Sequence, residues 1–195
     1  MDATPVQVTP LQLRDAIAVV HALVSGIDEQ GWPRPTPCDG WTVHDLVNHV
    51  VAGNLLFAGV VDGHETMQDL RARLPGDHLA PDPAGAFATA GDAVVTAFSA
   101  PGALEQTVTV PVGTVPAWVA LHLRITEVLV HGWDLAQALG LGISFDDTTV
   151  QQELEFGRTF VQQVPRGRKA FAPPEPVAAD APPLDQLVAL LGRRP

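Results

Sequence analysis

An apolar stretch of the chain between residues 119 and 139 carries charged and ionisable residues. Among them are Arg124, Glu127, His131 and Asp134. The stretch contains no proline and is long enough for a helix, and residues three or four apart share one face of a helix. A carboxylate and an imidazole in an apolar helix cost free energy unless another group pairs with them or binds them. The spacing therefore indicates a polar site on one face of a largely buried helix.

A divalent metal site is the chemistry that these residue types suggest. Imidazole nitrogens and carboxylate oxygens bind zinc, nickel, cobalt and iron. Glu127 and His131 can supply two ligands from one helix, and His49 can supply a third from a facing helix. Three protein ligands leave positions open for water or substrate, as in catalytic metal sites. Asp134, and Asp45 one turn before His49, could each orient an imidazole through its second nitrogen.

The same residues also have an interpretation without a metal. A glutamate four residues before a histidine is common in amphipathic helices, so this spacing alone is a weak signal. Glu127 could instead form an ion pair with Arg124, and His131 could be a hydrogen-bonded core histidine. Arg124 could also bind a substrate carboxylate through two parallel hydrogen bonds. The pattern leaves these roles open.

Composition argues against several classes of partner. The chain has 11 Lys and Arg against 22 Asp and Glu, a formal net charge of -11, and such an acidic surface repels nucleic acid and anionic lipid. The N-terminus lacks the basic and apolar regions of a secretory signal, and no uninterrupted apolar run reaches the roughly 18–20 residues of a membrane span. We therefore expect a cytoplasmic protein without nucleic-acid or membrane partners. The single cysteine, Cys38, excludes an intramolecular disulfide, and we expect it to be a structural thiol because no base or positive neighbour is evident.

Apolar periodicity and capping residues predict a mainly helical chain. The predicted helices cover about residues 10–27, 43–62, 83–99, 116–139, 147–164 and 184–191. The β-branched residues at 107–115 predict a small β-hairpin between the third and fourth of them. The length and the 46% hydrophobic content suffice for one core, so we expect a single domain over residues 1–195. Its bundle would cover about residues 9–164, followed by a proline-rich connector and a docking helix at 165–195.

Two motifs in the sequence resemble one known family. Residues Thr36–Val50, TPCDGWTVHDLVNHV, resemble the Thr-Pro-Cys-x-Gly-Trp-x-Val-x-x-Leu-x-x-His motif of actinobacterial DinB-like proteins. These belong with the N-terminal domain of mycothiol-dependent maleylpyruvate isomerase. The stretch Glu127–Ala138, EVLVHGWDLAQA, resembles the second motif of this family, and residues 171–195 resemble the tail of an uncharacterised metal-binding subfamily.

This resemblance implies an all-α, DinB-like four-helix bundle with one long crossover. It also implies a divalent metal held by His49, Glu127 and His131, with zinc most expected and nickel, cobalt or iron as alternatives. A low-molecular-weight thiol such as mycothiol is the implied partner, because a metal lowers the pKa of a bound thiol and presents the thiolate as a nucleophile. The implied function is a metal-dependent thiol S-transferase or isomerase, in which the thiolate attacks an electrophilic substrate with help from Arg124 or a metal-bound water.

The sequence also differs from the isomerase in one respect, and it allows a second function. The isomerase carries a further C-terminal domain that contributes to its active site, whereas a single short helix is predicted here. Isomerisation of maleylpyruvate itself is therefore not expected. The alternative function is a non-catalytic module that binds a metal or a small molecule. Related bundles often pair through their helices, so a homodimer is expected in either case.

Overall fold

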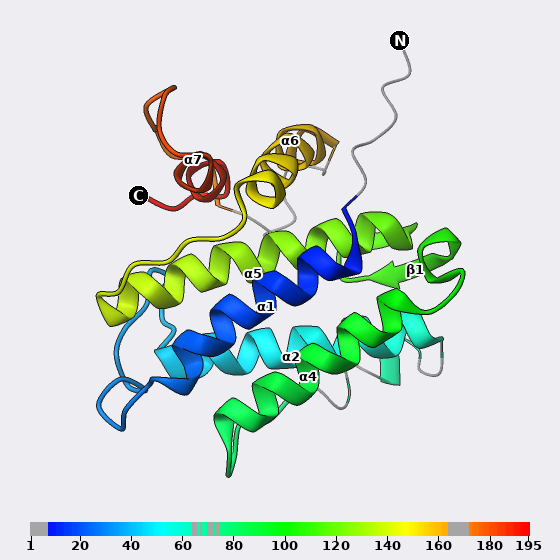
Figure 1. Cartoon of the computed structure of the whole chain (residues 1–195), viewed down its shortest axis with the longest axis horizontal. Helices are drawn as coiled ribbons and strands as arrows, with labels where there is room; N and C mark the ends of the chain where they lie inside the picture. The colour runs from blue at the N-terminus through cyan, green and yellow to red at the C-terminus, as the bar shows by residue number, and fades with distance from the viewer. Residues whose placement is uncertain (1–7, 64–65, 67, 70–71, 73–74, 164–171) are drawn as a thin grey trace.

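The regular elements of the described part of the chain are helices and one two-stranded β-hairpin (Figure 1). The computed structural model describes residues 8–195 except 64–65, 67, 70–71, 73–74 and 164–171. Its elements are α1 (Pro10–Ser25), α2 (Val43–Asp62), α4 (Pro83–Ser99), a 3₁₀ turn (Ala103–Glu105), β1 (Thr107–Val110), β2 (Gly113–Pro116), α5 (Ala117–Leu139), α6 (Asp147–Gln163) and α7 (Pro183–Leu190). The predicted all-α fold with a small hairpin is confirmed.

Helices α1, α2, α4 and α5 form a four-helix bundle. Each of them packs against two neighbours, α1 against α4 and α5 and α2 against α4 and α5, so the four form a ring in the order α1, α4, α2, α5. In this ring α1 lies diagonally opposite α2. Helices α2 and α4 run in the same direction (Figure 1). The connection between them, residues 63–82, therefore has to return along the length of the bundle. This is the long crossover that the family resemblance implies.

Capping residues start the helices at the predicted places. Thr42 accepts a hydrogen bond from the backbone nitrogen of Asp45 at 3.2 Å, and the carboxylate of Asp45 accepts one from the backbone nitrogen of Thr42 at 2.9 Å. This reciprocal capping box satisfies backbone donors that the first turn of α2 would otherwise leave unpaired. Asp82 caps α4 in a similar way by accepting from the backbone nitrogen of Gly85 at 3.0 Å. The caps fix where α2 begins and therefore where His49 lies along it.

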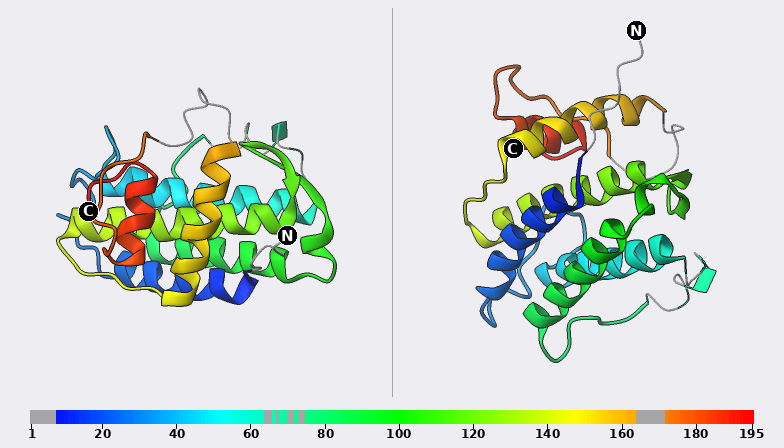
Figure 2. Two further views of the ribbon diagram at one scale, coloured as in Figure 1. Left: turned by 90° about the horizontal axis from the view of Figure 1, so that it is seen from above. Right: turned by 45° about the vertical axis from the view of Figure 1, so that its right-hand side comes forward.

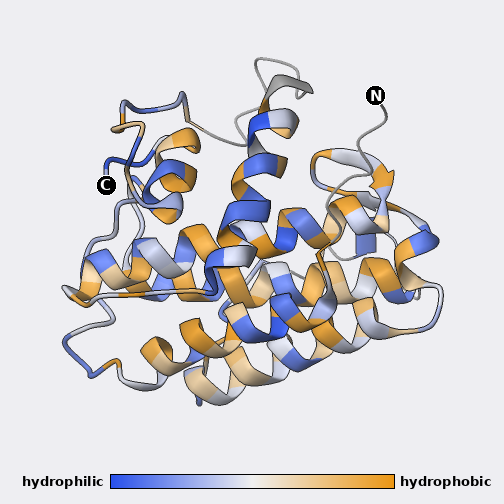
Figure 3. Ribbon diagram, turned by 45° about the horizontal axis from the view of Figure 1, so that its top comes forward, coloured by the Kyte–Doolittle hydropathy of each residue, from blue (hydrophilic) through white to orange (hydrophobic). Residues whose placement is uncertain are grey.

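Helix α5 is buried on nearly all sides because it lies between two layers. The bundle covers one side of it, and α6 and α7 cross over the other side (Figure 2). Every residue from Ala120 to Ala136 is buried except Glu127. Apolar residues gather where these layers face one another (Figure 3). A helix enclosed in this way can keep polar side chains only where they are paired or where a cavity reaches them.

The remaining elements agree with the predicted order. Strands β1 and β2 pair antiparallel, with Val108 opposite Val115, and α5 begins just after them. Residues 172–182 of the predicted connector lead to α7 without regular secondary structure and turn at residues 178–181, while residues 164–171 lie outside the described part of the chain. Among the helices that the structure describes, none has the length and apolar character needed to cross a bilayer. The arrangement as a single domain over residues 1–195 stays a prediction.

Candidate functional site

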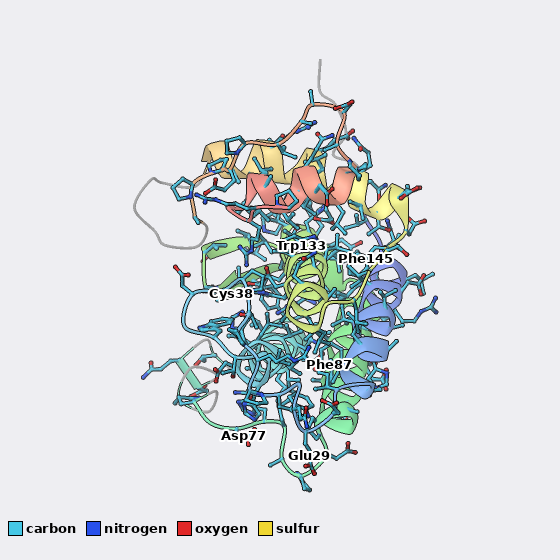
Figure 4. The ribbon with its side chains drawn as sticks, turned by 90° about the vertical axis from the view of Figure 1, so that its left-hand side faces the viewer. Glu29, Cys38, Asp77, Phe87, Trp133 and Phe145 are labelled. Carbon is cyan, nitrogen blue, oxygen red and sulfur yellow. The ribbon has the colours of Figure 1, made fainter. Side chains whose placement is uncertain are left out.

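A cavity of about 910 Å³ lies at one end of the bundle, where α2, α5 and the C-terminal residues meet. Figure 4 views this end of the molecule, with Cys38 on the loop before α2 and Trp133 on α5 beneath α7. The cavity is lined by side chains from three separate parts of the chain. Those used below are Cys38, Trp41, His49, Thr126, Glu127, His131, Arg193 and Arg194.

The three predicted metal ligands all line this cavity. The rings of His49 on α2 and His131 on α5 lie 5.1 Å apart, centroid to centroid, and are nearly perpendicular. Trp41 contacts both rings, with centroid distances of 4.8 Å to His49 and 6.1 Å to His131. Glu127 lies one turn before His131, and its side chain is 33% exposed. Two helices thus bring two imidazoles and one carboxylate to a single cavity, and their coordination of a metal stays a prediction.

The charge states of these groups suit a metal ligand set. Burial lowers the pKa of His49 to about 4, although the nearby carboxylate of Glu127 opposes this shift. Burial alone would raise the pKa of Glu127, but the positive charge of Arg124, together with His49 and His131, lowers it below its ordinary value. At neutral pH His49 is therefore a neutral imidazole and Glu127 is a carboxylate. These are the forms that bind metal ions.

Arg124 lies beneath Glu127 and not on the cavity wall. Its side chain is fully buried, its Nη1 lies 2.9 Å from Oε2 of Glu127, and its guanidinium lies over the ring of Phe57 at 5.5 Å. Gly53 on α2 leaves the space that the guanidinium fills, because a Cβ at this position would collide with it. The predicted ion pair of Arg124 with Glu127 is present. The expected role of Arg124 in binding or assisting a substrate is not supported, since the side chain has no exposed surface.

The two predicted orienting carboxylates have different positions. Asp134 is buried, and its Oδ2 accepts a hydrogen bond from Nδ1 of His131 at 3.0 Å. Asp45 is exposed, and its Oδ2 accepts from both the backbone nitrogen and the hydroxyl of Thr42. Asp45 therefore serves the cap of α2 instead of orienting an imidazole. Of the two, only Asp134 makes the predicted contact with a histidine.

The site contains two further residues, Arg193 and Cys38, whose partners the sequence did not reveal. Arg193 donates from Nη2 to Oδ2 of Asp134 at 2.9 Å and from Nε to Oδ1 at 3.3 Å. The thiol of Cys38 donates to Oδ2 of Asp134 at 3.3 Å, and Nη2 of Arg193 lies 3.6 Å from its sulfur. Cys38 and Arg193 are 155 residues apart, so no local pattern links them. The fold thus gives Cys38 a positive neighbour that was not evident in the sequence.

We expect the free energy of unfolding to fall at acidic pH as the carboxylate of Asp134 becomes protonated. Burial alone would raise the pKa of Asp134, but hydrogen bonds from His131 and Arg193 lower it below its ordinary value. A carboxyl whose pKa is lowered by folding stabilises the protein above its unfolded pKa of about 3.9, and this contribution is lost as the pH falls through the folded value. We expect the unfolding free energy of Asp134→Asn to be about 2 kcal/mol lower than that of the wild type at pH 7. This deficit should shrink progressively below about pH 4.

Urea unfolding of both proteins between about pH 3 and pH 7 measures this difference. The matched control is Asp15→Asn, because Asp15 pairs with Arg14 at 2.8 Å in an ion pair in which both side chains are more than half exposed. Exposed pairs contribute little, so the control should change the unfolding free energy by less than about 0.5 kcal/mol at any pH. A deficit of Asp134→Asn that stays constant down to pH 3 would contradict the assignment.

Comparison with known proteins places the chain in a family. Residues 13–136 match the family model described as the mycothiol maleylpyruvate isomerase N-terminal domain. Two uncharacterized proteins, from two strains of Mycobacterium tuberculosis, are each 37% identical over 181 residues, which cover 92% of this chain and 93% of theirs.

Solved structures share the fold. The crystal structure of a mycothiol-dependent maleylpyruvate isomerase matches with a TM-score of 0.61 at 18% identity, over 78% of this chain and 67% of that one. A variant of the isomerase, in which one histidine is replaced by alanine, matches with a TM-score of 0.56 at 17% identity over the same shares. The chain therefore belongs to the mycothiol maleylpyruvate isomerase N-terminal domain family, whose fold is DinB-like.

Proposed function

We propose that the protein binds one divalent metal and uses it with a low-molecular-weight thiol, such as mycothiol, as a thiol S-transferase or isomerase. The observation that carries this proposal is that His49, Glu127 and His131 line a single cavity from two different helices. Membership of a family named for a mycothiol-dependent enzyme supports the thiol. Zinc is the expected metal, because two imidazoles and a carboxylate with open positions are the ligands of many catalytic zinc sites.

The residues present fit such a metal. His49 is neutral and Glu127 is ionised at neutral pH, so both offer lone pairs. Asp134 accepts the hydrogen bond from Nδ1 of His131, which orients this ring and leaves its Nε2 to act as a ligand. A bound divalent metal would supply positive charge that lowers the pKa of a coordinated thiol.

The cavity itself supports a small-molecule reaction. Its volume of about 910 Å³ is at the upper end of the roughly 300–1,000 Å³ typical of small-molecule sites, enough for a thiol and a second reactant. Trp41 covers one side of the two imidazoles and provides an apolar surface against which a reactant can pack. The cavity wall would shield a thiolate held there in part from water, next to the electrophile. In the step that we propose, the thiolate sulfur bonds to an electrophilic carbon. In a transfer the leaving group departs with the electron pair of its broken bond, and in an isomerisation the new sulfur–carbon bond breaks again and releases the thiolate.

Cobalt substitution tests the proposal directly. The test uses a Cys38→Ser variant, because Cys38 otherwise contributes a protein sulfur to the same cavity. We expect mycothiol to change the visible absorption of the cobalt(II)-loaded variant and to add a sulfur-to-cobalt charge-transfer band. S-methylated mycothiol, which cannot form a thiolate, is the matched control and should add no such band. A spectrum that mycothiol leaves unchanged, with cobalt still bound, would contradict the thiol-dependent function.

One observation favours a non-catalytic binding module as the second candidate. The protein's own residues Leu191–Arg194 line the cavity, and Arg193 is held there by Asp134. A site covered in part by its own C-terminal residues would suit retention of a small molecule more than rapid turnover. In this case mycothiol or another ligand would bind without any electrophile being consumed. The expected homodimer is common to both candidates and is tested by the mass of the protein in solution.

A further inference from the structure

A second group of potential metal ligands lies beside the first. Oδ2 of Asp134 is 3.3 Å from Sγ of Cys38 and 3.0 Å from Nδ1 of His131, and Sγ and Nδ1 are 4.0 Å apart. Among the described residues, this is the group of three His, Cys, Asp or Glu ligand atoms that all lie within 4.8 Å of one another. It shares only His131 with the set of His49, Glu127 and His131.

We infer that Cys38, His131 and Asp134 form a second metal-binding position, for a thiophilic ion such as Zn²⁺ or Cd²⁺. Zinc bonds to sulfur at about 2.3 Å and to nitrogen or oxygen at about 2.0–2.2 Å, so the edges of a tetrahedral site are about 3.3–3.8 Å long. The three observed separations of 3.0, 3.3 and 4.0 Å bracket these edges. Only small side-chain movements would be needed to bring the atoms onto one ion.

Arg193 occupies the place of a cation in this group. The carboxylate of Asp134 is fully buried, and a buried charge requires a partner of opposite sign. Nη2 of Arg193 supplies that partner, at 2.9 Å from Oδ2 of Asp134 and 3.6 Å from Sγ of Cys38. Cys38, His131 and Arg193 all line the cavity, so an ion can approach from there. A metal ion would therefore displace the Arg193 guanidinium as it binds.

Binding at this position follows a simple proton balance. The Cys38 thiol gives its proton to solvent as the metal–sulfur bond forms, and no electron is transferred. The proton on Nδ1 of His131 is lost to solvent and Nε2 takes one up, so that Nδ1 can bind the ion and the ring stays neutral. The ion takes Nδ1 of His131, whereas an ion at His49 and Glu127 takes Nε2 of the same ring. A neutral imidazole has only one nitrogen with a free lone pair. The two positions therefore compete for His131, and we expect one ion to be bound at a time.

Cadmium titration with ultraviolet detection tests the inference, because a thiolate–cadmium bond has a charge-transfer band. We expect the band in the wild-type protein and in His49→Ala, which keeps all three ligands of the second position. Cys38→Ser should lose the band, and Asp134→Asn should bind cadmium at least tenfold more weakly. A wild-type protein without the band would overturn the inference, as would a band that persists in Cys38→Ser or disappears in His49→Ala. None of these outcomes depends on mycothiol, so they are distinct from failure of the proposed function.

Two further measurements test the displacement of Arg193. Arg193→Ala should bind cadmium at least tenfold more tightly, because the competing cation is gone. Arg194→Ala is the matched control and should leave the affinity unchanged, since Arg194 pairs with Glu175 and not with Asp134. In the wild-type protein, saturating cadmium should slow alkylation of Cys38 by iodoacetamide at least tenfold. An unchanged alkylation rate, or an Arg193→Ala protein that binds no more tightly, would overturn the proposal without relying on a variant that fails to fold.

Discussion

His131→Ala is expected to lower the zinc affinity of the Cys38→Ser protein by at least about 100-fold. Loss of a partner behind a metal ligand typically costs about 10–100-fold in affinity, and loss of the ligand itself should cost at least as much. His49→Ala should give a similar loss, because His49 supplies the only ligand from α2 in the predicted set. The Cys38→Ser background removes the sulfur of the second position, so the measured affinity reports on His49, Glu127 and His131. Competition with a chromogenic chelator measures it.

His44→Ala is the matched control for His49→Ala. His44 also lies on α2, but its imidazole is 41% exposed and lies 3.5 Å from the carboxylate of Asp77, away from the cavity. This variant should therefore keep its zinc affinity within about twofold. Equal zinc binding by Cys38→Ser and by its His49→Ala and His131→Ala derivatives would favour the interpretation without a metal. In that case Glu127 would serve only as the partner of Arg124.

Glu127 is a less direct probe of the same site because it has two partners. Its carboxylate lines the cavity, and it is also 2.9 Å from the buried guanidinium of Arg124. Nε, Nη1 and Nη2 of Arg124 have no hydrogen-bond partner of good geometry among the described residues. Replacing Glu127 would leave a buried charge without its counter-ion, which costs stability whether or not a metal binds. A lower metal affinity of Glu127→Gln therefore has to be compared with its unfolding free energy.

Local spacing predicted the part of the site that lies on one helix. Glu127, His131 and Asp134 are three or four residues apart, so a helix necessarily places them on one side. Periodicity does not reveal how deeply a side chain is buried, so the sequence left Arg124 open between pairing with Glu127 and binding a substrate. In the structure Arg124 is fully buried and paired with Glu127, in the space left by Gly53. His49 was added mainly through a family motif, since a lone histidine on a helix carries little information.

Contacts between distant segments could not be predicted in the same way. Arg193 reaches Asp134 only because α6 and α7 fold back across α5 (Figure 2). No local pattern in the sequence indicates that α6 and α7 pack back across α5. The same holds for the pair of His122 and Glu153, which are 31 residues apart in the sequence but 2.9 Å apart in the structure. Long-range pairs of this kind depend on packing of whole elements, which periodicity alone does not determine.

Glu153→Ala is expected to lower the unfolding free energy by about 3–5 kcal/mol. Glu153 on α6 is fully buried, and its two carboxylate oxygens lie 2.9 Å from Nδ1 of His122 and 2.7 Å from the hydroxyl of Thr126. Both partners are buried on α5, so this carboxylate joins the outer layer to the bundle. Removing one member of a buried hydrogen-bonded pair leaves the other polar groups without partners, which accounts for a loss of this size. Chemical unfolding at neutral pH measures it.

Two further variants separate the buried pair from effects on α6 itself. Glu155→Ala lies on the same helix but is exposed, and it should change the unfolding free energy by less than about 0.5 kcal/mol. Glu153→Gln keeps the shape of the side chain and removes its charge. Burial raises the pKa of Glu153 despite the hydrogen bonds from His122 and Thr126, so its contribution to stability declines as the pH rises through the folded value. The loss of unfolding free energy in Glu153→Gln, relative to the wild type, should therefore shrink between about pH 4.3 and neutral pH. A loss that grows over this range would contradict this prediction and would show that the charged pair itself stabilises the fold.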